Sequence, residues 1–178
     1  MGFATGSPTI LHYIEAETAV ANLHASGISQ AVTFKILECW GHDGLLRHGD
    51  QVASFYKAKR DNCEAAAREV LGANKSKSQK SVAVWVTPVA GMFLWLRLKL
   101  PPAKTSELGD SFALINEKAR GKGILAVPGM SFLPDKGVSC YVRTSFSLIP
   151  EEQVKEGFLR LRSVVEEAWK EQGLEVPE

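Results

Sequence analysis

The chain has 178 residues and three cysteines, and its 21 basic and 20 acidic side chains leave a formal net charge of +1. This length suits one domain, and so small a charge excludes a strong field that would draw the protein to nucleic acid or to an anionic membrane. No apolar run reaches the roughly 18 residues of a membrane span, and three widely spaced cysteines suit a reducing compartment. We therefore expect a cytoplasmic protein with no nucleic-acid or membrane partner.

Helical patterns fill the first part of the chain. Ser7 and Pro8 make an N-cap and N1 pair, and Gly41 interrupts the apolar stripe before Asp43-Gly44 restarts it. The last of these helices would be about 27 residues, or roughly 40 Å at 1.5 Å per residue, which is more than one small core usually spans. The expected helices run from Pro8 to about Leu23, then up to Gly41, and then from Leu45 to about Leu71.

Alternating side chains predict strands in the second half of the chain. The pattern is clearest from Met92 to Leu100, where Phe93, Trp95 and Arg97 lie on the face opposite to the leucines. The expected strands are Val82–Val86, Met92–Leu100, Ile124–Val127 and Cys140–Phe146, and Phe3–Thr5 has the composition of a strand end.

Two further helices complete the pattern. One is expected from about Ser106 to Arg120, and another opens with Pro150 at N1 and acidic residues in its first turn. The polar stretch Asn74–Lys80 is expected to be a solvated loop. Three helices followed by the order β-β-α-β-β-α predict an α/β fold, in which helices cover a mixed sheet behind a helical N-terminal part.

Arg143 lies inside a segment that otherwise has the pattern of a strand, and Tyr141 and Ser145 share its face. A guanidinium in a half-buried strand needs an anion, and its planar fork binds a carboxylate through two parallel hydrogen bonds. The segment alone leaves two interpretations open. In the first, Arg143 has a structural role, because it pairs with an internal carboxylate or lies at the sheet edge. In the second, Arg143 binds the carboxylate of a ligand.

No other motif in the sequence indicates a chemistry. The histidines lack the spacing of zinc sites, and the chain has no P-loop, dinucleotide fingerprint or nucleophile elbow. The cysteines have no visible activating partner. We therefore expect no metal site, and these residues alone indicate an α/β domain whose function they do not declare.

Seven segments, in order and covering nearly the whole chain, resemble the C-terminal part of class I/II aminotransferases. These are fold type I enzymes that use pyridoxal 5′-phosphate, and the likeness is greatest to the aromatic, kynurenine and 2-aminoadipate subgroup. One such segment is a weak signal, whereas seven in order are specific. The segments are Gly2–Gly6, Ser29-Gln30, Trp40–His48, Tyr56–Asp61, Pro88–Trp95, Val127–Phe132, and Tyr141–Ser147 followed by Glu156-Gly157.

The resemblance assigns substrate-binding roles to three residues. Arg143 matches the family arginine that grips the substrate α-carboxylate, which agrees with its chemistry, because a bidentate clamp fixes the orientation of the amino acid. Phe93 matches a side chain that lines a pocket for aromatic or long aliphatic substrates, with plain core packing as the alternative. Gly91 matches the tight turn before that strand. Pro128-Gly129 matches a loop that approaches the substrate, and Gly27–Gln30 matches a segment near the dimer interface.

The family's Schiff-base lysine has no counterpart here. In the family it precedes the segment that matches Gly2-Phe3, and the residues that hold the cofactor ring come earlier still. Lys57 and Lys59 lie on an expected helix, and the lysines from Lys75 to Lys80 lie in the polar stretch. No catalytic or cofactor-binding residue is therefore assigned in this chain, and the chain alone is expected to be inactive.

The resemblance also implies a division of the chain. Residues 1–35 would be a remnant of the large, cofactor-binding domain, and residues 36–178 would be the interdomain helix and the C-terminal small domain. The implied function is the C-terminal part of an aminotransferase that moves an amino group between an aromatic or long-chain amino acid and a 2-oxo acid on pyridoxal phosphate, with a homodimeric full-length parent. The alternative is a non-catalytic dimerisation or regulatory module derived from such an enzyme.

Overall fold

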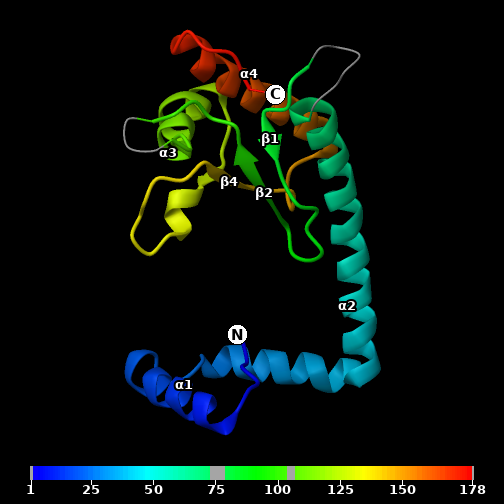
Figure 1. Cartoon of the computed structure of the whole chain (residues 1–178). Coiled ribbons are helices and arrows are strands. Elements are labelled where there is room, and N and C mark those ends of the chain that lie inside the picture. The colour runs from blue at the N-terminus through cyan, green and yellow to red at the C-terminus, as the bar shows by residue number, and fades with distance from the viewer. Residues whose placement is uncertain (1, 73–78, 104–106, 178) are drawn as a thin grey trace. The chain divides into compact units, whose positions relative to one another are not determined.

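The computed structural model describes residues 2–72, 79–103 and 107–177 (Figure 1). Most of the polar stretch expected at Asn74–Lys80 and the expected helix start at Ser106 lie outside these residues. The chain divides into two compact units, Met1–Val52 and Ala53–Glu178. This division falls within a helix, and it leaves the expected boundary after residue 35 a prediction. No helix among the described residues is long and apolar enough to cross a membrane.

The first unit is helical, as the sequence predicts. Helix α1 spans Pro8–Ala21, with Pro8 at its start and the Ser7 hydroxyl accepting a hydrogen bond from the Ile10 amide at 3.5 Å. Helix α2 spans Gly27–Leu71, and it begins in this unit and ends in the other. The expected interruption at Gly41 is confirmed, because its φ of 64° and ψ of −176° lie outside the helical region. Glycine adopts a positive φ without the steric strain that a Cβ atom would cause.

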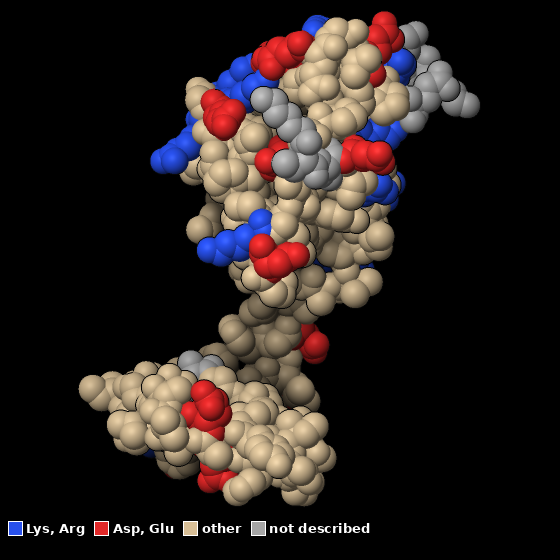
Figure 2. All heavy atoms as spheres, turned by 60° about the vertical axis from the view of Figure 1, so that its left-hand side comes forward, with Lys and Arg blue, Asp and Glu red and all other residues tan. Residues whose placement is uncertain are grey.

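The strand end expected at Phe3–Thr5 is wrong, because these residues have no regular secondary structure. A strand needs a neighbour to pair its N–H and C=O groups, and no described strand lies in this unit. None of the described residues from 2 to 52 is buried, and on the face in Figure 2 the unit that carries α1 has few charged side chains. Its exposed apolar side chains include Phe3, Tyr13, Val20, Leu23, Ile28 and Phe34.

The second unit contains a four-stranded sheet in the order β1-β2-β4-β3. The α/β class is confirmed, but the mixed pairing is wrong, since every described pair is antiparallel. The helical connection after β2 does bring β3 back parallel to it, yet β4 inserts between the two and pairs antiparallel to both. The strands are β1 (Ala83–Val84), β2 (Phe93–Leu98), β3 (Val127–Pro128) and β4 (Tyr141–Ser145).

The helical segments of this unit differ from expectation at their starts. Helix α3 begins at Ser111 because the Asp110 carboxylate caps it, accepting a hydrogen bond from the Phe112 amide at 2.8 Å. Pro150 is the N-cap of α4 instead of its first residue. The segments are α3 (Ser111–Ala113), the π-helix η2 (Leu114–Ala119), the 3₁₀ turns η3 (Arg120–Lys122) and η4 (Gly129–Phe132), and α4 (Glu151–Glu171).

One hydrophobic core holds this unit together. It takes side chains from one face of the sheet, from η2 and α4, and from the last turns of α2. Figure 1 shows these helical segments around the sheet. Leu94, Leu96 and Leu98 of β2 are almost completely buried on that face, as their alternation predicts. Phe93, Trp95 and Arg143 are therefore directed to the opposite face of the sheet.

Candidate functional site

The opposite face of the sheet gathers the residues that the sequence singled out. Arg143 lies on β4, an interior strand, and its Cα partners are Trp95 on β2 and Val127 on β3. Phe93 lies two residues before Trp95 and therefore shares its face. The sheet-edge interpretation of Arg143 is thus wrong, because strands flank β4 on both sides.

The guanidinium of Arg143 lies over two aromatic rings. Its Cζ atom is 4.1 Å from the centre of the Phe93 ring and 4.6 Å from the centre of the Phe132 ring. At these distances the ring quadrupoles attract the cation. Its Nε atom is buried and has no hydrogen-bond partner, and no carboxylate among residues 2–72, 79–103 and 107–177 forms an ion pair with it. The internal ion pair is therefore not found in the described part of the chain.

Phe132 is held in place by a second aromatic contact. Its ring lies edge-on to Trp95, with the ring centres 4.8 Å apart and the planes at 68°. Both side chains are about two-fifths exposed. An edge-to-face pair of this kind contributes about 0.5–1.5 kcal/mol beyond its buried area. Trp95 is the Cα partner of Arg143 on the neighbouring strand, and it thereby fixes the ring that covers Arg143.

A close approach of two backbone segments brings Phe132 over the sheet. Pro128 pairs with Val142, and a Cβ atom at Gly129 would lie 2.4 Å from Ser139 Oγ and 3.0 Å from Tyr141 Cβ. Only glycine fits there, so η4 starts in direct contact with the segment that leads into β4. Side chains three residues apart eclipse each other in a 3₁₀ turn, which carries Phe132 to the same side as Gly129.

The turn that carries Gly91 is tied to α2. Gly91 has a φ of +80°, which suits glycine. Upstream in the same loop, the Arg60 side chain donates a hydrogen bond to the Pro88 carbonyl at 3.1 Å. The buried carboxylate of Glu64 accepts hydrogen bonds from Thr87 Oγ1 at 2.5 Å and from Trp85 Nε1 at 3.2 Å. These contacts fix the loop that leads into β2 and so to Phe93.

The environment of Glu64 keeps its carboxyl group ionised. Burial opposes the charged form, but the hydrogen bonds from Thr87, Arg68 and Trp85, together with the charge of Arg68, outweigh it and lower the pKa of Glu64. Arg68 donates to the same oxygen at 2.5 Å. Glu64 is therefore a charged anchor for the loop and already has its partners.

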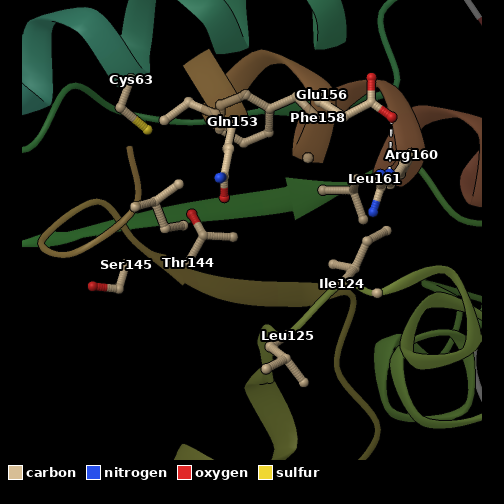
Figure 3. A pocket seen from close by; sticks show the side chains of 14 residues that line it. Cys63, Ile124, Leu125, Thr144, Ser145, Gln153, Glu156, Phe158, Arg160 and Leu161 are labelled. Carbon is tan, nitrogen blue, oxygen red and sulfur yellow. Dashed lines mark hydrogen bonds and ion pairs between the residues drawn. The ribbon is translucent and has the colours of Figure 1, made fainter. Parts of the chain in front are cut away.

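A cavity of about 630 Å³ lies elsewhere in the unit (Figure 3). Thr144 and Ser145 line it, but Arg143 and Phe93 do not, and Figure 3 shows Gln153 pointing into it.

Cys63 also lines this cavity. Burial, with a smaller contribution from the charge of Glu64, raises the pKa of the Cys63 thiol to about 11. A thiol that stays protonated at neutral pH is a poor nucleophile, so this cavity offers no cysteine chemistry.

The structure thus brings two of the three expected substrate residues together and places the third nearby in the chain. Arg143 and Phe93 are in contact, and Gly91 forms the turn just before Phe93. The sequence did not single out Phe132 or Trp95 as site residues. Alternation could have found Trp95, which shares the face of Phe93, whereas nothing local in the sequence indicates that the η4 turn folds over β4.

The comparisons with known proteins point to one group of enzymes. No protein-family profile matches the chain. The aminotransferase tdiD of Emericella nidulans is 35% identical over 166 residues, which are 93% of this chain and 35% of that protein. The mitochondrial kynurenine/alpha-aminoadipate aminotransferase of Mus musculus is 36% identical over 169 residues, or 94% of this chain and 36% of that protein.

A solved structure agrees with these relatives. The kynurenine aminotransferase of Pyrococcus horikoshii, in complex with PMP, KYN as substrate and KYA as product, matches with a TM-score of 0.68 and 27% identity. The match covers 90% of this chain and 35% of that one. The chain therefore spans little more than a third of the length of the proteins that it matches.

Proposed function

This chain is homologous to fold type I, pyridoxal-phosphate-dependent aminotransferases over little more than a third of their length, and from that premise we propose that it is the C-terminal portion of such an enzyme and supplies its substrate-carboxylate clamp. The whole enzyme would move an amino group between an aromatic or long-chain amino acid and a 2-oxo acid. Arg143 would bind the α-carboxylate, and Phe93 would line the pocket beside it. Gly91 would form the turn that sets the position of Phe93.

The observation that carries this proposal is that Arg143 has no partner for its charge among the described residues. Its guanidinium is partly buried, its Nε atom lacks a partner, and no described carboxylate neutralises it. Leaving a buried donor unsatisfied costs about 1–3 kcal/mol, and more for a charged group. A bound carboxylate would supply the missing acceptor and the missing negative charge. The flanking rings suit a substrate with an apolar or aromatic side chain.

The residues of this chain do not fit an anchor for the cofactor. Pyridoxal phosphate supplies the electron sink of transamination, and the family holds it through a lysine. Every lysine that the structure describes is at least partly exposed, and several are paired with surface carboxylates, such as Lys122 with Glu167 and Lys155 with Glu69. This chain would therefore bind and orient substrate, while the cofactor site would come from the rest of the enzyme.

A second function has its own supporting observation. The unit Met1–Val52 has no buried side chain among its described residues and exposes many large apolar ones. Contiguous exposed apolar surface marks a site of association. A non-catalytic dimerisation or regulatory module would use this surface, whereas in the proposed enzyme part the large, cofactor-binding domain would cover the same surface. The homodimeric parent and the cytoplasmic location stay predictions.

The test joins this chain to a cofactor-binding portion. The 178 residues are fused to the N-terminal portion of the Emericella nidulans relative, and transamination of kynurenine, 2-aminoadipate and aromatic amino acids with 2-oxo acids is measured. The proposal expects activity that needs pyridoxal phosphate and an amino donor with an α-carboxylate. A folded, cofactor-loaded fusion that turns over none of these donors, while the chain alone forms a stable dimer, would favour the module.

A further inference from the structure

Phe132 reaches Arg143 from outside the sheet, whereas Phe93 approaches it from the neighbouring strand. The Phe132 and Phe93 ring centres lie 4.6 Å and 4.1 Å from the guanidinium carbon, and the Trp95 ring contacts Phe132 edge-on, with the ring centres 4.8 Å apart. Neither phenylalanine can donate or accept a conventional hydrogen bond. Their effect on Arg143 is therefore to restrict where its planar fork lies, and to leave its N–H groups without a competing partner.

We propose that Phe132 is a positioning residue for Arg143, and that Phe132 and Phe93 together form an aromatic clamp that presents the guanidinium to an apolar carboxylate ligand. The inference rests on the proposed function, since it names how the carboxylate arginine is held. It extends that function to a residue, Phe132, that lies on the η4 turn outside the sheet.

The physical reason is the cost of ordering a long side chain. Immobilising a rotamer-rich side chain on binding costs free energy, and a side chain that is already held in its bound conformation avoids that cost. An internal carboxylate would also hold Arg143, but it would occupy the N–H groups that the ligand needs. The quadrupole of an aromatic ring attracts the cation to the ring face and leaves those N–H groups available. The clamp thus combines a fixed arginine with an open binding edge.

The chain offers a matched control for Phe132. Phe112 is 43% exposed and Phe132 is 42% exposed, but Phe112 lies on α3, and among the described residues its ring forms no cation–π contact with Arg143. Phe132→Leu removes the aromatic face and keeps an apolar side chain of similar bulk. Phe132→Tyr keeps the face. Because Phe132 is a partly exposed turn residue, neither change is expected to unfold the protein.

The experiment uses the whole 178-residue chain labelled with ¹⁵N-arginine. The Nε–Hε resonance of Arg143 is assigned by its loss in Arg143→Lys. We expect its proton to be shifted upfield by the two rings and to exchange slowly with water, because Nε is buried. Phe132→Leu should move the resonance downfield and raise its exchange rate at least about tenfold. Phe132→Tyr and Phe112→Leu should leave both unchanged.

A titration with 3-phenylpropionate, a carboxylate with an aromatic ring and no amine, completes the test. It should shift the Arg143 resonance, and Phe132→Leu should weaken its binding about 3- to 10-fold, as loss of one pre-ordered side chain implies. Binding and an Arg143 resonance that are both insensitive to Phe132→Leu would overturn the clamp and leave the carboxylate site standing. An upfield, protected resonance that phenylpropionate does not shift would overturn the proposed function, and it would support only the placement of Arg143 by the two rings.

Discussion

The hydroxyl group of Thr87 donates a hydrogen bond of 2.5 Å to the carboxylate of Glu64, and so joins the loop before β2 to α2. The indole of Trp85 and the guanidinium of Arg68 donate to the same oxygen. One buried charge thus organises three donors from two segments of the chain. The loop that it fixes leads to Gly91 and Phe93. A substitution at Glu64 therefore tests whether this loop supports the candidate site.

Glu64→Gln should destabilise the second unit by about 1–3 kcal/mol, because hydrogen bonds to charged groups contribute about 1.5–3 kcal/mol and glutamine keeps one acceptor. Urea unfolding measures the change. Glu156→Gln is the matched control, since Glu156 also pairs with an arginine four residues on but is about half exposed. Such an exposed pair contributes about 0.3–0.5 kcal/mol. Equal effects of the two substitutions would contradict the anchoring role of Glu64.

The same carboxyl group predicts a dependence of stability on pH. Its folded-state pKa lies below the ordinary value, so its contribution is complete above the unfolded-state pKa of about 4.3 and is lost as the pH falls through that value toward the folded-state pKa. The difference in unfolding free energy between the unchanged protein and Glu64→Gln should therefore shrink below about pH 4. Chemical unfolding at a series of pH values measures it. A difference that grew on acidification would have the wrong sign.

In the fusion with the N-terminal portion of the Emericella nidulans relative, Arg143→Lys should lower kcat/KM by roughly 10- to 1000-fold for amino acid donors, while the cofactor stays bound. Lysine keeps the charge but loses the planar fork, and with it one hydrogen bond and the alignment of the substrate. Donors that lack a carboxylate should be almost indifferent to the change. Arg97→Lys, an exposed arginine on the neighbouring strand β2, is the control. If Arg143 only braces the sheet, amines with and without a carboxylate will lose activity alike.

The isolated chain should form no stoichiometric covalent adduct with pyridoxal phosphate. No lysine in the described part of the chain is buried in a site that would orient the cofactor. The measurement is reduction with borohydride after mixing with the cofactor, followed by mass spectrometry of the peptides. We expect weak labelling spread over several lysines. One lysine labelled to completion at neutral pH would show that this chain holds its own cofactor anchor.

Limited proteolysis should cut the chain first within residues 1–35. The described residues there have no buried side chain, whereas β4 and α4 contribute several residues to the core. Proteases act where the backbone opens at low free-energy cost. Time-resolved mass spectrometry of the fragments should therefore yield a resistant product that retains Tyr141–Ser145. Equal protection of both regions would mean that residues 1–35 fold into a stable structure of their own.

The sequence by itself determined the local features of this protein. Alternation assigned the two faces of β2 and β4, so that Phe93 and Trp95 share one side and Arg143 points away from the core. Ser7 and Gly41 marked a helix start and a helix interruption. Each of these depends on neighbours within a few residues, which is the range over which side-chain period, capping and backbone freedom act.

Only the tertiary structure decided what lies beside Arg143. The insertion of β4 between β2 and β3 placed Trp95 opposite it and made the sheet antiparallel throughout its described pairs. The close approach of Gly129 to the segment before β4 then brought Phe132 over the guanidinium. Strand order and the path of a turn depend on contacts between residues far apart in the chain, and a local pattern carries no information about which distant segments will pack together.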